Sequence, residues 1–155
     1  MQKLSLEKWL DRQQLSRNAN LLFSDAIKCY KAEAYRASLL FSYLAFITVL
    51  KERLLGATEP GLLPAGHWQR LLDKLQDEDR WEGATFDATQ EKEVIGAGKV
   101  KTKDAIFSIN DNLGTQIKYW KDRRNDCAHF KDNEITTYHV ASFWIRPCYP
   151  PAESS

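Results

Sequence analysis

The sequence has few cysteines, and they are too far apart to form a recognisable site. The 155 residues include only Cys29, Cys127 and Cys148, with no C-x-x-C pair. An odd number of widely spaced cysteines predicts neither a disulfide framework nor a zinc site, and is typical of a reducing compartment. His67 and His139 also lack partners at ligand spacing. We therefore expect no metal and no cofactor.

A long apolar segment is also missing. The longest uncharged run covers residues 37–50, which is shorter than the about 20 apolar residues that a membrane-spanning helix needs. The first residues, MQKLSLEKWLDRQQ, have no apolar core of the kind found in signal peptides. These two absences predict a cytoplasmic protein that does not associate with membranes.

Neither sign of charge is in excess. The 22 Lys and Arg residues and 21 Asp and Glu residues leave a formal net charge of +1. Such a balance neither requires nor excludes a nucleic-acid partner, because only a local basic patch would argue for one.

Apolar residues instead recur every three or four positions along most of the chain, which predicts helices. With 43% hydrophobic residues, a chain of this length can build one core. We predict an all-α bundle of four to five helices, without a sheet, as a single domain over residues 1–146. Residues 147–155 are predicted to be a flexible tail or linker. The expected helices cover residues 6–33, 34–55, 68–76, 103–129 and 136–145, with an irregular insertion around residues 77–100.

One short stretch near the end of the fourth predicted helix carries residues suited to catalysis. It reads Arg124-Asn125-Asp126-Cys127-Ala128-His129. The motif resembles the signature of the HEPN superfamily, in which an Arg and a polar residue, often Asn, are followed after a few residues by His. The segments AIKCYKAEAYRASLLFSYLAFITVLKERLL and 133–143 are also similar to the front helical pair and closing helix of that family, so the resemblance covers about three-quarters of the chain.

The resemblance implies a metal-independent endoribonuclease of HEPN type. It implies Arg124, Asn125 and His129 as the catalytic set, and a homodimer with both motifs at the interface. It also implies a toxin or antiviral defence effector, paired with an antitoxin or part of a larger defence complex. Lys131 departs from the toxins that pair with a nucleotidyltransferase antitoxin, which commonly have a Tyr two residues after the His.

The residue types suit cleavage of RNA by its own 2′-OH. A histidine can accept or donate a proton near neutral pH, and an arginine offers a planar set of donors to phosphate oxygens. Positions five apart on a helix differ by about 140°, so Arg124 and His129 do not share a face, whereas Asn125 and His129 do. Either the arginine side chain swings round or the helix is irregular there.

Basic residues gather around the motif in sequence, and a patch of this kind would bind phosphates. The same charges could form an ordinary solvated helix face, and four aspartates are interspersed. Tyr119 and Trp120 could stack a base or belong to the core. The predicted RNA-binding residues are Lys118, Lys121, Arg123 and Lys131.

Two other interpretations remain open. The chain could be a non-catalytic HEPN domain that binds RNA or nucleotide. It could also be a plain helical interaction module within a larger system, if the match to the motif is a coincidence.

Overall fold

The computed structural model describes the greater part of the chain. The described residues are 4–60, 63, 65–90, 92–93, 101–103, 106–107, 109, 111–129 and 134–144. They group into two compact units, which are considered one at a time. The first unit combines Met1–Val49 with Thr115–Ser155, and the second is Leu50–Gly114. The prediction of a single domain over residues 1–146 stays a prediction, and the predicted tail at 147–155 lies outside the described residues.

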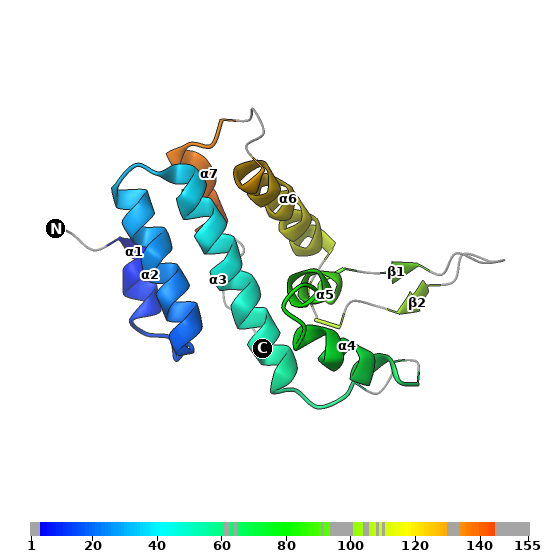
Figure 1. Ribbon diagram of the computed structural model, residues 1–155. Helices are drawn as coiled ribbons and strands as arrows, with labels where there is room; N and C mark the ends of the chain where they lie inside the picture. The colour runs from blue at the N-terminus through cyan, green and yellow to red at the C-terminus, as the bar shows by residue number, and fades with distance from the viewer. Residues whose placement is uncertain are drawn as a thin grey trace. The chain divides into compact units, whose positions relative to one another are not determined.

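Helices build both units, as the sequence predicted (Figure 1). They are α1 (Ser5–Leu10), α2 (Arg17–Lys31), α3 (Tyr35–Leu55), α4 (His67–Leu75), α5 (Trp81–Asp87), α6 (Asp111–Ala128) and α7 (Thr137–Phe143). The all-α prediction is therefore confirmed. None of the described helices is long and apolar enough to cross a membrane.

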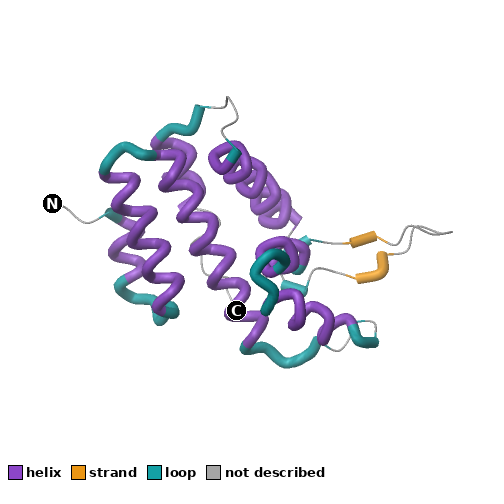
Figure 2. The backbone as a smooth tube through the Cα atoms, viewed as in Figure 1, coloured by secondary structure: helices purple, strands orange, loops and turns teal. Residues whose placement is uncertain are grey.

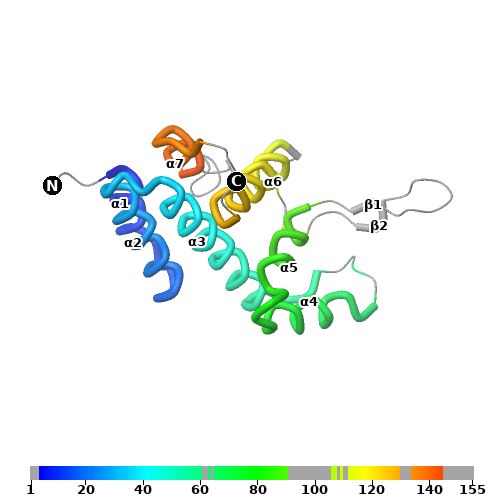
Figure 3. The backbone as a smooth tube through the Cα atoms, turned by 45° about the horizontal axis from the view of Figure 1, so that its top comes forward, coloured from blue at the N-terminus to red at the C-terminus, as the bar shows by residue number. Residues whose placement is uncertain are grey.

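The first predicted helix is in fact two helices, α1 and α2. The chain leaves the helical path after Asp11 and begins again with Ser16 as the N-cap of α2. The Ser16 hydroxyl oxygen accepts a hydrogen bond of 3.1 Å from the backbone N–H of Ala19. This bond satisfies one of the amides that have no partner at a helix start, so the cap favours a new helix over a continuous one. In Figures 1 and 3, α1 lies beside α2, and α2 beside α3.

The core of the first unit centres on Phe143 of α7, which is fully buried. Its ring lies 5.5 Å from that of Trp120 on α6, 5.9 Å from that of Phe46 and 6.4 Å from that of Tyr43, both on α3. Aromatic pairs at such separations add about 0.5–1.5 kcal/mol each beyond the burial of their surface. Phe143 thus joins three helices that are distant in sequence and fixes the C-terminal half of α6 against α3.

The second unit packs the end of α3 against α4 and α5. Leu54 of α3 joins Trp68, Leu71 and Leu75, which recur along α4 at the spacing of one helical face. Figure 2 shows a short two-stranded ribbon beyond these helices. It consists of β1 (Lys92–Glu93) and β2 (Lys101–Lys103), which pair antiparallel. The prediction that the chain contains no sheet missed this ribbon.

The prediction of an irregular insertion over residues 77–100 is wrong where α5 forms. Asp77 organises the turn before it: one carboxylate oxygen accepts a 2.9 Å hydrogen bond from the N–H of Asp79, and the other accepts a 3.0 Å bond from Nε of Arg80. These two interactions also lower the pKa of Asp77. The buried residues of α5 are Ala84, Thr85 and Phe86. Because they are consecutive in a helix of only seven residues, the sequence shows no helical period that would have predicted α5. Residues 91 and 94–100 lie outside the described residues.

The fourth helix begins later than predicted, at Asp111 instead of about residue 103. Residues 101–103 form β2 instead, because they pair with the strand across the ribbon. Gly114 lies inside α6 near its start, where an added Cβ would come within 3.5 Å of the Thr89 carbonyl. The other predicted helices, over 34–55, 68–76 and 136–145, agree with α3, α4 and α7 within two residues at each end.

Candidate functional site

The predicted motif lies at the C-terminal end of α6, in the first unit. Arg124 and Asn125 belong to the last turns of the helix, and His129 follows its last residue. The N–H of His129 donates a 3.0 Å hydrogen bond to the Asn125 carbonyl, which continues the helical pattern by one residue. Asn125 is half-buried and His129 is exposed, so the histidine is accessible to a ligand.

Arg124 is half-buried, and two neighbouring side chains contact its guanidinium. Its Nη1 donates a hydrogen bond of 2.9 Å to Oδ1 of Asn125, and its guanidinium carbon lies 5.8 Å from the centre of the Tyr43 ring. A guanidinium at this distance from an aromatic ring gains a favourable cation–π interaction. Asn125 and Tyr43 together therefore orient Arg124 from two sides.

Arg123 has different neighbours. Its Nε lies 3.1 Å from Oδ2 of Asp126, and its guanidinium lies 5.2 Å from the centre of the Tyr119 ring. The Asp126 side chain is 5% exposed and that of Arg123 is 28% exposed, so this ion pair is largely shielded from water. A pair in this setting mainly supports the structure of α6, and Arg123 is less available to RNA than the sequence suggested.

A third arginine, Arg36 at the start of α3, belongs to the same neighbourhood. Burial raises the pKa of the Cys127 thiol, while the positive charges of Arg36 and Arg123 act in the opposite direction and the charge of Asp126 adds to the rise. Neither Arg36 nor Tyr43 is predicted from the sequence, because nothing in the first third of the sequence marks residues that meet the end of α6. The charges of Arg36, Arg123 and Asp126 thus all act on Cys127 within the motif.

The exposed face of α6 carries the two described lysines of the predicted RNA-binding set. Lys118, Lys121, Asn125 and His129 follow one another at intervals of three or four residues, which places them along one side of a helix. Lys118 is exposed and Lys121 is half-buried. Lys131 lies outside the described residues.

The two aromatic residues before the motif differ in their surroundings. Trp120 is 7% exposed and packs on Phe143, so it belongs to the core. Tyr119 is 45% exposed and lies beside Arg123, where it is accessible from solvent. Of the two, only Tyr119 is available to stack a base.

The structure thus assembles part of the predicted catalytic set. It brings Arg124 and Asn125 into direct contact and leaves His129 exposed on the Asn125 side of the helix. The convergence of Arg124 and His129 on one phosphate stays a prediction. In the described part of the chain, no group of three or more His, Cys, Asp or Glu residues is arranged to hold a metal ion.

Comparison of the chain with models of known protein families, with curated proteins and with solved structures finds no match.

Proposed function

We propose that the chain is a metal-independent endoribonuclease of HEPN type, with Arg124, Asn125 and His129 as its catalytic residues. The observation that carries the proposal is the side-chain hydrogen bond between Arg124 and Asn125 directly beside the exposed His129. Such a bond fixes the orientation of a phosphate-binding guanidinium before the substrate arrives, which reduces the entropy lost on binding.

In the proposed reaction the 2′-oxygen of a ribose attacks the adjacent phosphorus, and the bond between phosphorus and the 5′-oxygen breaks. One histidine accepts the 2′-OH proton and a second acid protonates the leaving 5′-oxygen. The products are a 2′,3′-cyclic phosphate and a 5′-hydroxyl. The Arg124 guanidinium offsets the negative charge that builds up on the phosphate oxygens in the transition state.

The motif provides a single histidine, whereas the reaction uses both a base and an acid. A homodimer with both motifs in one cleft supplies two copies of His129 for these two roles. We therefore propose a dimer with the end of α6 at its interface. The exposure of His129 is compatible with such an arrangement.

The RNA backbone would follow the exposed face of α6. Lys118 and Lys121 would neutralise phosphates on either side of the cleaved bond, and the predicted RNA-binding set also includes Lys131, which lies outside the described residues. The biological setting that we propose, a toxin or antiviral defence effector acting with an antitoxin or within a larger defence complex in the cytoplasm, depends on the family resemblance alone.

One observation favours a second function, the binding of RNA without cleavage. Arg123 lies against the half-exposed ring of Tyr119, and an aromatic ring backed by a cation is a suitable surface for stacking a nucleobase. A non-catalytic domain would use this surface and the lysines of α6 without needing a proton-transfer role for His129.

The deciding experiment measures cleavage of a mixed RNA by the purified chain in the presence of EDTA. We expect fragments ending in 2′,3′-cyclic phosphate, and a loss of activity of about 10²-fold or more in both Arg124→Ala and His129→Ala. Circular dichroism would check that both variants remain folded.

Matched controls separate the motif from general effects. Arg17→Ala removes an exposed arginine from α2, and His139→Gln replaces a histidine by a residue that can maintain the capping box of α7. Both should cleave RNA normally. Unchanged RNA binding without any cleavage would establish the second function, and cleavage that survives His129→Ala would refute the proposed catalytic role.

A further inference from the structure

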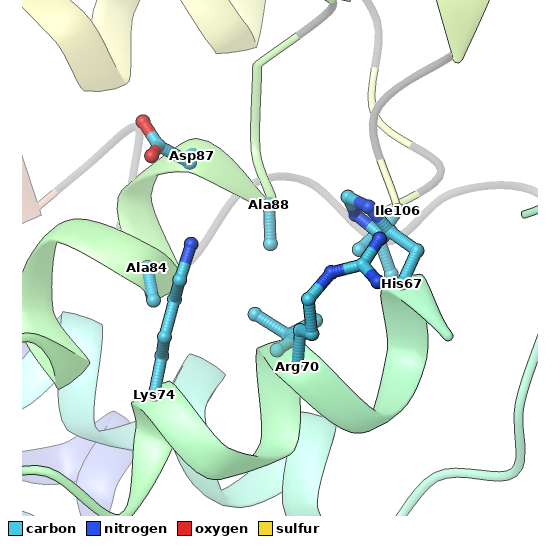
Figure 4. A pocket seen from close by; sticks show the side chains of 8 residues that line it. His67, Arg70, Lys74, Ala84, Asp87, Ala88 and Ile106 are labelled. Carbon is cyan, nitrogen blue, oxygen red and sulfur yellow. The ribbon is translucent and has the colours of Figure 1, made fainter. Parts of the chain in front are cut away.

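The second unit contains a pocket between α4 and α5 that is separate from the proposed catalytic residues (Figure 4). His67, Arg70 and Lys74 of α4 line one side of it. Asp87 and Ala88, at the end of α5, line the opposite side. The pocket has a volume of about 60 Å³, which is room for a few water molecules or one small polyatomic ion.

The three basic side chains face the pocket because of their spacing. Positions 67, 70 and 74 recur at intervals of three and four residues, so they lie on one side of α4 over two turns. In Figure 4 the Arg70 and His67 side chains line the same part of the pocket, and the Lys74 side chain extends past Ala84 towards the end of α5. A small ligand between α4 and α5 would therefore meet nitrogen donors from three side chains.

The position of Arg70 depends on the glycine that precedes the helix. Gly66 is the N-cap of α4 and has a φ of 75°, and a Cβ at this residue would lie 3.0 Å from Nη1 of Arg70. The missing side chain thus leaves the space in which the guanidinium folds back towards the start of the helix. Arg70 is exposed, and in this position its guanidinium lies at the edge of the pocket near the start of α4.

Apolar residues form the remaining walls. Ala84 and Ala88 are almost completely buried, and Leu71 packs in the core of the second unit with Ile106 against it. These groups offer a ligand no hydrogen bonds. The polar contacts of a ligand would therefore be made to the side chains of α4, of which Arg70 and Lys74 are exposed and His67 is half-buried.

Charge identifies the class of ligand. Arg70 and Lys74 are positively charged and His67 can add a third charge, whereas Asp87 is the only acidic side chain among the described residues that line the pocket. A ligand with several acceptor oxygens and two negative charges offsets this excess, and an arginine matches such oxygens with two parallel hydrogen bonds.

We infer that this pocket binds the phosphate group of a phosphomonoester, with Arg70, Lys74 and His67 as ligands to its oxygens. The phosphate lies between α4 and α5, and the rest of the molecule extends into solvent. Asp87 opposes the negative charge of the phosphate and limits its affinity. This assignment does not depend on the proposed cleavage of RNA.

The test is calorimetric titration of the full chain with glycerol 3-phosphate and, in a parallel arm, with inorganic phosphate, at constant ionic strength. We expect both to bind with a Kd on the order of 1 mM or below. Arg70→Gln and Lys74→Gln should each weaken binding about tenfold, as expected for the loss of a charge-assisted hydrogen bond. Arg53→Gln, the same kind of change at an exposed arginine of α3 in the same unit, should have no effect.

Asp87→Asn is expected to change phosphate affinity in the opposite direction to Arg70→Gln and Lys74→Gln. Damage to the fold would weaken binding and so could not produce this result. Removing the carboxylate charge should tighten phosphate binding several-fold. The assignment is overturned if neither ligand binds at 10 times the expected Kd, on the order of 10 mM. It is equally overturned if only inorganic phosphate binds, or if Arg53→Gln weakens binding as much as Arg70→Gln does.

Discussion

Arg123 and Asp126 form an ion pair within the last turns of α6, with 3.1 Å between Nε and Oδ2, and the aspartate side chain is 5% exposed. A carboxylate in such a position needs its partner, because burial of an unpaired charge is strongly unfavourable. The pair therefore links the stability of the first unit to the segment that contains the proposed catalytic residues.

We expect Asp126→Ala to lower the free energy of unfolding by about 2 kcal/mol, since it leaves the partly buried Arg123 without this counter-charge. Urea denaturation would measure the change. Asp122→Ala, which removes an exposed carboxylate from the same helix, should shift stability by less than about 0.5 kcal/mol. Equal effects of the two substitutions would contradict the structural role of the pair.

A buried hydrogen bond joins α3 to the end of α7. Nε1 of Trp144 donates to Oγ of Ser42 over 2.8 Å, and Ser42 is fully buried. Trp144→Phe and Ser42→Ala should each cost about 1–2 kcal/mol, because each leaves a buried polar group unsatisfied. The double variant should lose less than the sum of the two, which denaturation of all four proteins would test. Tyr138→Phe, at a side chain that is 77% exposed, is the neutral control.

Two glycines of the second unit should respond to alanine with opposite signs. Gly66→Ala forces a Cβ onto a residue with a φ of 75° and towards Arg70, so we expect a loss of about 1–2 kcal/mol. Gly83 lies within α5, and an added Cβ there meets no atom within 4 Å. Gly83→Ala should therefore stabilise the protein by about 0.5–1 kcal/mol, because alanine favours the helix. Thermal unfolding distinguishes the two, and the same sign for both would be evidence against this account.

Cys127 should react slowly with alkylating reagents at neutral pH. Burial raises its pKa, so the neutral thiol persists to higher pH than in an unfolded chain. Because folding favours the neutral thiol, this group does not reduce the free energy of unfolding below the ordinary thiol pKa. As the pH rises from that value through the raised pKa of the folded chain, the free energy of unfolding falls. The measurement is the rate of iodoacetamide labelling against pH, in a variant with Cys29→Ser and Cys148→Ser that retains only Cys127. The pH at which the rate reaches half its maximum should be higher for the folded chain than for the chain in denaturant. A lower midpoint would indicate an activated thiol.

If RNA follows the exposed face of α6, its affinity should depend on salt through Lys118. Lys118→Ala should weaken binding of single-stranded RNA and reduce the slope of log K against log salt by about 0.7. Lys28→Ala, at an exposed lysine of α2, is the matched control and should leave the slope unchanged. An unaltered slope in Lys118→Ala would remove this lysine from the RNA-binding set. Fluorescence anisotropy at several salt concentrations provides the measurement.

Local patterns predicted several elements well. The apolar middle of α3 and the apolar stripe of α4 follow from periodicity, which reflects the face that each helix buries. Ser16, a residue type that commonly caps a helix, marks the break between α1 and α2, although the apolar pattern continues across it and predicts a single helix. Residues 101–103 could not be assigned in this way, because a strand this short is decided by its partner across the ribbon.

In the candidate site, too, some residues are predicted from the sequence and others are brought in by packing. Arg124, Asn125 and His129 were identified from their order in the sequence, and the contact between Arg124 and Asn125 joins neighbours. Tyr43 and Arg36 come from α3 and reach the motif only through the packing of α3 against α6. The sequence predicts that Arg123 binds RNA, whereas the structure pairs it with Asp126. The sequence does not indicate this role, because the burial of the two side chains depends on how the rest of the first unit packs around them.

The sequence by itself determined the helical character of the chain and the residue types available for chemistry, since both depend on neighbours within a few positions. Tertiary structure decided which arginines are shielded, which aromatic ring remains accessible, and that His67, Arg70 and Lys74 face Asp87 across one pocket. These relationships arise from the packing of distant segments, and burial then sets the strength of each charge.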